Sequence, residues 1–239
     1  TDLEIAVLRL PSLSNFSDLD PLETEASLRL RWIQPGEPLG EPDAVIVPGS
    51  KQTLKDLEIL KNSGLADLVK NFAENGGHVF GICGGLQMMG ELLEDPDQLE
   101  GGPSQAIGLK LLPLSTRFTP SKVLRQLDVE MIWPIRTRVQ GYELHQGMTH
   151  PSNNSWNPIS ADNAGLCGRS KEGNCAGTYL HGIFDNGCWR RSWINHLRDA
   201  RSLPSLPINQ PNHAAQREKL LERLADSFDK HVEWQKLLD

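Results

Sequence analysis

The sequence has no hydrophobic run long enough to cross a membrane, because its apolar segments fall well short of the ~20 residues that a spanning helix needs. No basic segment followed by an apolar stretch, the mark of a signal peptide, is evident. We therefore expect a cytoplasmic protein without a membrane partner. The sequence also begins at Thr1 rather than Met, from which we expect a fragment or a processed chain.

Positive charge is also scarce. The 239 residues carry 24 Lys and Arg against 31 Asp and Glu, which gives a net charge of −7. Such a chain lacks the positive field that binding to a phosphate backbone requires, so we expect no nucleic-acid partner. Hydrophobic residues nevertheless make up 38% of the sequence, which is enough to bury a core and to exclude the disordered class.

Motifs for metals and nucleotides are missing. The chain has four cysteines, namely Cys83, Cys167, Cys175 and Cys188. They form no C-x-x-C pair and their gaps fit no common zinc spacing, so we expect reduced thiols and no metal site. The segment 48–51 (Pro-Gly-Ser-Lys) is only superficially similar to a P-loop, because the G-x-x-x-x-G-K-[ST] spacing is absent. We expect no cofactor in this chain.

The first hundred residues alternate between strand-like and helix-like segments. Continuously apolar runs are typical of strands that are buried on both faces of a parallel sheet, and leucines at helical spacing predict helices between them. The expected strands are 3–10, 27–32, 44–47 and 78–82, and the expected helices are two within 53–73, divided near Gly64, and one at 84–93. This order predicts an α/β fold with a mostly parallel central sheet flanked by helices.

The pattern changes beyond residue 100, where strands follow one another without long helices between them. The expected strands are 107–112, 129–133, 138–145 and 178–180, and the expected helix is 189–201. Three prolines within 202–211 predict a linker, and an apolar stripe predicts an amphipathic helix over 213–234. We divide the chain into a domain at 1–202 and, at 203–239, a linker with a helix packed on or beside that domain.

The most specific feature is the segment Val79-Phe-Gly-Ile-Cys-Gly-Gly-Leu-Gln87, in which a buried strand leads directly into a helix. A cysteine stands at the junction and glycines surround it, as in a nucleophile elbow with Cys in place of Ser. The free N–H groups at the start of the helix favour a thiolate. We predict that Cys83 is a nucleophile and that the N–H of Gly84 faces a developing oxyanion. A buried structural cysteine is the plainer alternative.

A cysteine nucleophile needs a base, and two histidines are candidates. His181 follows a short apolar strand and precedes a glycine, a placement that holds an imidazole rigidly. His145, in Gly141-Tyr-Glu-Leu-His145, is its rival. Gly49 ends the preceding buried strand, where it is suited to provide a second oxyanion donor.

These motifs together resemble the class I, triad-type glutamine amidotransferases and, more narrowly, the glutaminase domain of the cobyric acid synthase family. The resemblance covers about residues 3–200 and is carried by 48–51, 81–87, 141–145, 178–185 and the opening segment 5–21. It implies that the layers of the fold are flavodoxin-like. It also implies that Cys83 attacks the side-chain amide of glutamine and that His181 relays the proton.

The same resemblance implies further site residues and partners. Gly49 and Gly84 would form the oxyanion hole, and the implied glutamine-binding residues are Ser50, Gln87, Tyr142, Glu143 and His145. An N-terminal synthetase domain, missing from this chain, would use ATP and Mg²⁺ to amidate peripheral carboxylates of a corrinoid, adenosylcobyrinic acid a,c-diamide, in cobalamin biosynthesis. The chain described here would hydrolyse glutamine and supply the ammonia.

The sequence departs from the triad pattern at one position. Many class I members carry Glu two residues after the catalytic histidine, and here that residue is Ile183. The cobyric acid synthase group shares this lack, so we expect a Cys–His dyad. Asp185, four residues after His181, is a possible substitute, although nothing in the sequence shows that it acts as one.

Three other functions remain open. The chain is alternatively a free-standing glutaminase subunit of another amide ligase, such as one that amidates a cell-wall lipid; only the opening segment argues against this. The second is a non-catalytic regulatory domain of the same fold, against which the intact Cys83 and His181 argue. The third is a cysteine hydrolase of the peptidase or deglycase type, which usually has an acidic residue before the nucleophile strand, where this chain has His78-Val79.

Overall fold

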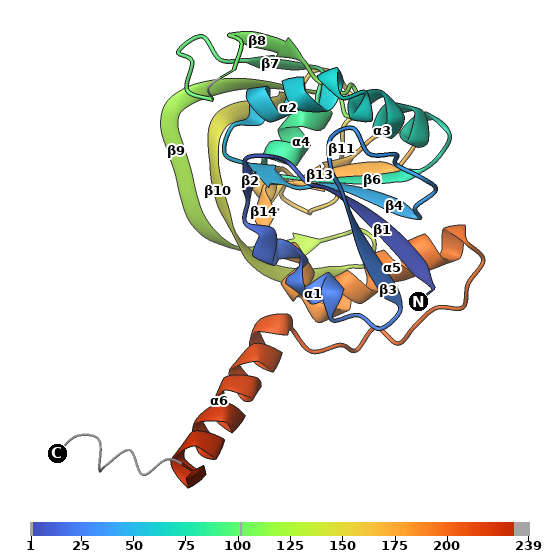
Figure 1. Cartoon of the computed structure of the whole chain (residues 1–239), viewed down its shortest axis with the longest axis vertical. Helices are drawn as coiled ribbons and strands as arrows, with labels where there is room; N and C mark the ends of the chain where they lie inside the picture. Colours follow the sequence, from blue (N-terminus) through green and yellow to red (C-terminus); the bar gives the residue numbers. More distant parts are fainter. Residues whose placement is uncertain (1, 101, 232–239) are drawn as a thin grey trace, which may run out of the picture.

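A seven-stranded sheet forms the centre of the computed structural model, which describes residues 2–100 and 102–231 (Figure 1). Its strand order is β11-β12-β13-β6-β4-β1-β3. The strands are β1 (Leu3–Leu8), β3 (Leu28–Ile33), β4 (Ala44–Val47), β6 (His78–Ile82), β11 (Asn157–Pro158), β12 (Gly168–Arg169) and β13 (Cys175–Thr178). From β13 to β3 all neighbours are parallel, and the last two strands pair antiparallel at the β13 edge. The predicted α/β class with a mostly parallel sheet is confirmed.

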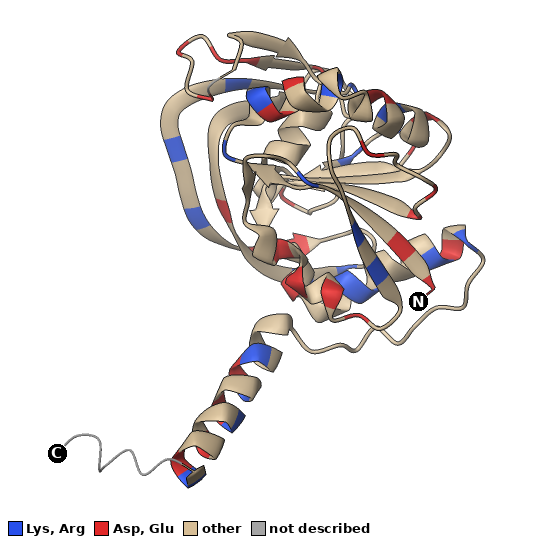
Figure 2. Ribbon diagram, in the orientation of Figure 1, with Lys and Arg blue, Asp and Glu red and all other residues tan. Residues whose placement is uncertain are grey.

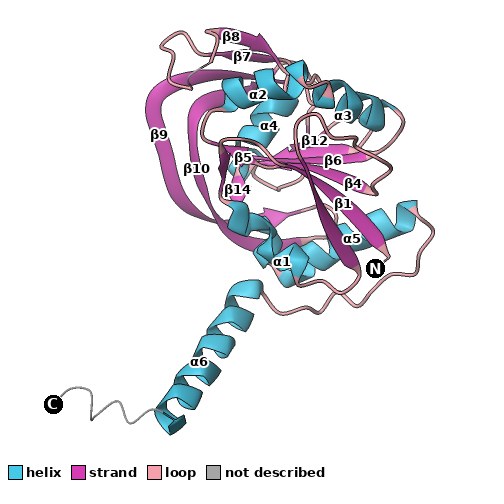
Figure 3. Cartoon of the chain, viewed as in Figure 1, coloured by secondary structure: helices cyan, strands magenta, loops and turns pink. Residues whose placement is uncertain are grey.

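Helices cover both faces of this sheet (Figure 3). They are α1 (Asp20–Glu23), α2 (Thr53–Asn62), α3 (Leu65–Glu74), α4 (Gly84–Met89) and α5 (Gly187–Ala200). Strand β6 shows how the two faces differ, because successive residues of a strand point to opposite sides. Phe80 contacts Trp189 and Trp193 of α5 with ring centroids 5.9 and 5.8 Å away. Its neighbour Gly81 lies against Leu86 of α4.

A second sheet of five strands, ordered β14-β10-β9-β7-β8, curves around the first. Its strands are β7 (Leu92–Glu94), β8 (Gln105–Ile107), β9 (Leu114–Met131), β10 (Thr137–Pro151) and β14 (Leu180–His181). The long β9–β10 hairpin contains the predicted strands 129–133 and 138–145 but extends well beyond them. The strand predicted at 107–112 is mostly loop, and the helix predicted to end at residue 93 ends at Met89.

The opening segment is bound to the end of β4. Strand β2 (Leu13–Ser14) pairs antiparallel with β5 (Gly49–Ser50). The buried carboxylate of Asp56 in α2 accepts the N–H of Ser12, at 3.2 and 3.3 Å, and the hydroxyl of Ser50, at 2.6 Å. These bonds hold residues 12–14 beside the start of α2. A short 3-10 helix, η1 (Phe16–Leu19), follows directly.

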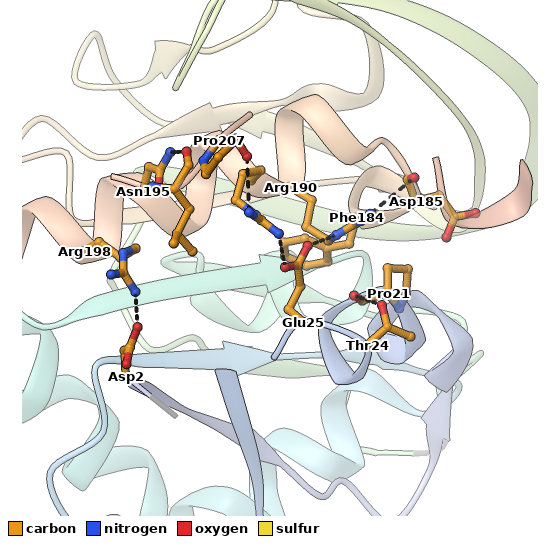
Figure 4. Close-up of polar contacts among 12 residues, drawn as sticks. Asp2, Pro21, Thr24, Glu25, Phe184, Asp185, Arg190, Asn195, Arg198 and Pro207 are labelled. Carbon is orange, nitrogen blue, oxygen red and sulfur yellow. Dashed lines mark hydrogen bonds and ion pairs between the residues drawn. The ribbon is translucent and has the colours of Figure 1, made fainter. Parts of the chain in front are cut away.

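A buried ion pair joins the segment after α1 to α5 (Figure 4). Arg190 donates from Nε to Oε1 of Glu25 at 2.9 Å and from Nη1 to the carbonyl of Phe184 at 2.6 Å. Arg191 donates to the other oxygen of Glu25 at 2.6 Å. Because a buried charge without its partner is strongly destabilising, these contacts fix the opening segment against the 3-10 helix η3 (Ile183–Asp185).

The C-terminal region has two parts. Residues 203–211 run along α5, where the side chain of Asn195 donates to and accepts from the backbone of Leu206 at 2.8 Å. Helix α6 (His213–His231) then projects from the domain with both charge signs along it (Figure 2). None of its described residues is buried, and its exposed apolar side chains are Leu220, Leu221, Leu224 and Phe228.

The expectation that this helix packs on or beside the domain therefore holds only at its first turn. There His213 Nδ1 lies 3.9 Å from a carboxylate oxygen of Asp185. Residues 232–234, the predicted end of the helix, lie outside the described residues. Within residues 2–100 and 102–231, no helix has both the length and the apolar character to cross a membrane.

Candidate active site

Cys83 lies at the junction between β6 and α4 in a strained backbone conformation. Its φ is 52° and its ψ is −110°, which side-chain-bearing residues rarely adopt. The N–H of Cys83 donates to the carbonyl of Thr178 in β13 at 2.8 Å. The structure therefore forms the tight strand-to-helix turn that the sequence predicted, with the thiol at its tip.

The glycines that follow Cys83 allow α4 to begin directly against the end of β4. A Cβ atom on Gly84 would lie 2.8 Å from the backbone nitrogen of Ser50, and one on Gly85 would overlap the carbonyl oxygen of Val47. No side chain fits at either place without moving backbone. The elbow is consequently fixed by steric contact as well as by hydrogen bonds.

His181, the last residue of β14, is fully buried, and the thiol of Cys83 donates to the carbonyl of Leu144 at 3.5 Å. Burial lowers the pKa of the His181 imidazole, but the hydrogen bond to Asp18 and the interactions with the charges of Asp18 and Cys83 raise that pKa to about 10. The ring of Tyr142 stacks on the imidazole with centroids 5.1 Å apart. This environment favours an imidazolium beside the sulfur at neutral pH.

The structure gives His181 a carboxylate partner that the sequence reading missed. Nδ1 of His181 lies 2.7 Å from Oδ2 of Asp18 in η1, and the N–H of Gly182 donates to Oδ1 of the same carboxylate at 2.9 Å. Asp185 instead has His213 as its neighbour, at 3.9 Å. The imidazole thus has a carboxylate neighbour where the sequence led us to expect none, and that neighbour is Asp18 and not Asp185.

A cavity of about 230 Å³ opens beside Cys83. Residues from the opening segment, from α2 and from the β9–β10 hairpin form its walls. Of the residues predicted to bind glutamine, three line it: Ser50, Gln87 and His145. Gln87 is buried, and its side-chain nitrogen donates to the carbonyl of Gln146 at 3.0 Å and to the hydroxyl of Tyr179 at 2.9 Å.

His145 lines the same cavity but lies in a different environment from His181. Its ring stacks on that of Tyr179 with centroids 3.8 Å apart. Burial lowers the pKa of His145, so it is neutral at neutral pH. The imidazole of His145 therefore favours the neutral form and that of His181 the charged form, and Cys83 contributes to the raised pKa of His181.

The other two predicted pocket residues lie outside the cavity walls. Tyr142 covers the imidazole of His181 and lines a separate groove along β9 and β10. Glu143 is buried and paired with Arg125 of β9. Tyr142 is three residues from His145 and therefore lies on the opposite side of β10. Glu143 is two residues away and on the same side, but its carboxylate is paired with Arg125.

The two predicted oxyanion donors flank the thiol. Gly84 is the first residue of α4, where the N–H groups have no partner within the helix. Gly49 lies in β5, opposite Ser14, and a Cβ on it would lie 3.7 Å from Cε1 of His181. Their role as hydrogen-bond donors to substrate stays a prediction.

Three charged residues line the cavity, and two of them, Glu100 and Lys122, carried no sequence signal. Glu100 is buried, and one of its oxygens accepts the N–H of Thr53 at 2.7 Å. Lys51 and Lys122 are exposed residues on the cavity wall. Glu100 and Lys122 are distant in sequence from every motif, so only the folded chain shows that they lie near Cys83.

Comparison with known sequences gives a consistent result. The CobB/CobQ-like glutamine amidotransferase domain matches residues 4–189. The cobyric acid synthases of Synechococcus sp. (strain CC9605) and Prochlorococcus marinus (strain MIT 9313) are 57% and 52% identical over 100% and 99% of this chain. The matched region makes up 48% and 49% of those proteins, so the chain spans about half the length of these relatives.

Comparison with solved structures supports the fold alone. The PurLQS structure from Thermotoga maritima matches with a TM-score of 0.62 at 14% identity, over 82% of this chain and 100% of that one. A crystal structure of a glutamine amidotransferase matches with a TM-score of 0.58 at 16% identity, over 74% and 89% of the two chains. The flavodoxin-like layering expected from the sequence agrees with these matches.

Selective labelling tests the assignment of the nucleophile. We expect a glutamine analogue with an electrophilic side chain, such as a diazoketone, to modify Cys83 rapidly near neutral pH and to spare the other cysteines. Burial raises the pKa of Cys167 and Cys175 to about 12, which suppresses their thiolates. Peptide mapping locates the adduct, with Cys83→Ala as the control. An adduct on Cys167, Cys175 or Cys188 would overturn the assignment.

Separate variants distinguish the two histidines. His181→Ala should lower kcat for glutamine hydrolysis roughly 10²–10⁴-fold, the usual loss when a general acid–base group is removed. His145→Ala should mainly raise KM, because this side chain lines the cavity and burial lowers its pKa. Steady-state kinetics separate the two effects. A reversed pattern would transfer the role of base to His145.

Proposed function

Because the chain belongs to the CobB/CobQ-like glutamine amidotransferase domain family, we propose that it is the glutaminase half of an ATP-dependent corrinoid amidase. In this proposal it hydrolyses glutamine to glutamate and delivers ammonia to a synthetase domain. That domain amidates peripheral carboxylates of adenosylcobyrinic acid a,c-diamide with ATP and Mg²⁺, in cobalamin biosynthesis. The names of the relatives, and their doubled length, support the assignment.

One observation carries the proposal: a Cys–His pair opens into a small cavity that has charges of both signs. Glutamine has an α-ammonium and an α-carboxylate in addition to the amide that reacts. Glu100 is suited to bind the ammonium, and Lys51 and Lys122 are suited to bind the carboxylate. These charges favour a free amino acid over a glutaminyl residue within a peptide, in which both groups are masked.

The arrangement supports a two-stage hydrolysis. The sulfur of Cys83 attacks the amide carbon of glutamine, and the N–H groups of Gly49 and Gly84 stabilise the oxyanion. The imidazolium of His181 then donates a proton to the leaving nitrogen, and ammonia departs. His181 next accepts a proton from water, which attacks the thioester, and glutamate leaves as Cys83 is regenerated.

The environment of the thiols favours the cytoplasm. All four cysteines are free, and none of them is arranged as a disulfide. Reduced thiols are typical of cytosolic proteins. We therefore propose a cytoplasmic location for the full enzyme.

Substitution of Glu100 tests how the cavity recognises glutamine. Glu100→Gln should raise KM for glutamine roughly 10–100-fold with little change in kcat, because one hydrogen bond between charged groups is worth about 1.5–3 kcal/mol. Glutamine keeps an oxygen for the N–H of Thr53, so the fold should persist. Glu58→Gln, an exposed position in α2, is the matched control. Equal KM values for the two variants would remove Glu100 from substrate binding.

Isotope transfer tests the function as a whole. With [amide-¹⁵N]glutamine, the chain should release ¹⁵N-ammonia, and Cys83→Ala should release none. When the synthetase domain, ATP, Mg²⁺ and the corrinoid are added, ¹⁵N should appear in corrinoid amides. Ammonia release with transfer to a different acceptor would favour the free-standing ligase subunit. No release under either condition would favour the non-catalytic domain.

A further inference from the structure

The carboxylate of Asp18 is held on both oxygens. One oxygen lies 2.7 Å from Nδ1 of His181, and the other accepts the backbone N–H of Gly182 at 2.9 Å. Asp18 is 6% exposed and His181 is fully buried. A carboxylate in this position fixes both the rotation of the imidazole and the tautomer in which Nδ1 carries the proton, which leaves Nε2 for the sulfur side.

We propose that Asp18 is the positioning residue of a Cys83–His181–Asp18 triad and that the opening segment supplies it in place of a carboxylate after the histidine. This inference rests on the proposed glutaminase function and adds a residue to its mechanism. The carboxylate of Asp18 acts through His181 and not on the substrate. It orients His181 and stabilises the imidazolium that forms when the thiol loses its proton.

The segment around Asp18 is held rigidly, as a positioning residue requires. Upstream, Ser12 is bonded to Asp56 and β2 pairs with β5. Downstream, Glu25 forms the buried ion pair with Arg190, which also binds the carbonyl of Phe184 in η3. The ion pair of Glu25 and Arg190 therefore ties the chain after Asp18 to η3, the segment that follows His181.

A neighbouring amide lies against the imidazole, at almost the same distance from its two nitrogens. Asn15, with φ of 50°, places its side-chain nitrogen 3.2 Å from Nδ1 and 3.1 Å from Nε2 of His181. The N–H of Asp18 donates to the carbonyl of Asn15 at 2.9 Å. Asn15 and Asp18 therefore approach His181 as one short turn of chain.

The charged and titratable groups that face His181 are few. Asp18 comes from η1, Cys83 from the elbow and Tyr142 from β10. Asp18 and Cys83 favour the imidazolium. Asp185 has His213 as its ion-pair neighbour, at 3.9 Å, and burial raises its pKa. Asp185 is therefore a suitable control position for Asp18, because it is a nearby carboxylate whose ion-pair neighbour is His213.

Two matched variants separate these carboxylates. Asp18→Asn should lower kcat for glutamine hydrolysis roughly 10²–10⁴-fold with KM changed by less than about threefold, because the amide cannot accept the Nδ1 proton in the same way. Asp185→Asn should retain kcat within about twofold. Asp18→Glu, which restores the charge on a longer side chain, should recover at least about tenfold of the loss.

Alkylation of Cys83 by iodoacetamide gives a readout that needs no glutaminase activity. Without the charge of Asp18, the pKa of His181 falls and the thiolate–imidazolium pair is less stable. The thiolate then forms only at higher pH, so the midpoint of the alkylation rate against pH should rise by about 1–3 units, the usual effect of one close opposite charge. Asp185→Asn should leave this midpoint unchanged.

The outcomes are distinguishable. If wild-type protein hydrolyses no glutamine, the proposed function fails, whereas the alkylation profile still tests the triad. Unchanged kcat and an unchanged midpoint in Asp18→Asn, or equal losses in Asp185→Asn, would overturn the proposal. If Asp18→Asn does not fold, NMR of ¹⁵N-histidine-labelled wild type decides, with His181→Gln to identify the signal. A His181 Nδ1–H proton protected from exchange supports the proposal, and its absence refutes it.

Discussion

The first turn of α4 packs directly on the backbone at the end of β4, and the whole site is arranged around this contact. Only glycine fits at positions 84 and 85, so helix and strand meet without intervening side chains. At this junction Cys83 has a positive φ, and its thiol donates to the carbonyl of Leu144 in β10 at 3.5 Å. Because the N–H of Cys83 is bound to β13, the strand that precedes His181 is aligned by the same junction. Strain in the elbow is thus balanced by the packing of α4 on β4 and by the hydrogen bond to β13.

The site is also a meeting point of distant parts of the chain. Asp18 and His181 are 163 residues apart, and Glu25 and Arg190 are 165 apart. The second pair is buried and is satisfied by several hydrogen bonds, which makes it suited to specify one arrangement of the opening segment. The opening segment is therefore an integral part of the site, although most of it is outside the sheet and has little regular structure.

The sequence predicted the elements that have a strong local pattern. Strands β4 and β6 are apolar at nearly every position because they are buried on both faces, and the elbow has its glycines in one short motif. The β9–β10 hairpin was largely missed because its middle is solvent-exposed and its residues do not alternate in polarity. The apolar stripe in 213–234 correctly predicted helix α6. An apolar stripe does not reveal which surface covers it, and the apolar side chains of α6 are mostly exposed.

Local sequence patterns also could not locate Asp18, the carboxylate beside His181. The sequence drew attention only to position 183, where related enzymes carry Glu and this chain has Ile, and to Asp185. Both positions are near His181 along the chain. After Gly182, with its φ of 76°, the chain turns into η3, whose Ile183 and Phe184 are buried in the core. A carboxylate at Ile183 would therefore enter apolar surroundings rather than lie beside the imidazole. A carboxylate partner for Nδ1 therefore has to come from a segment other than the one that follows His181. The opening segment is that segment, and its pairing with β5 brings Asp18 to within 2.7 Å of the imidazole.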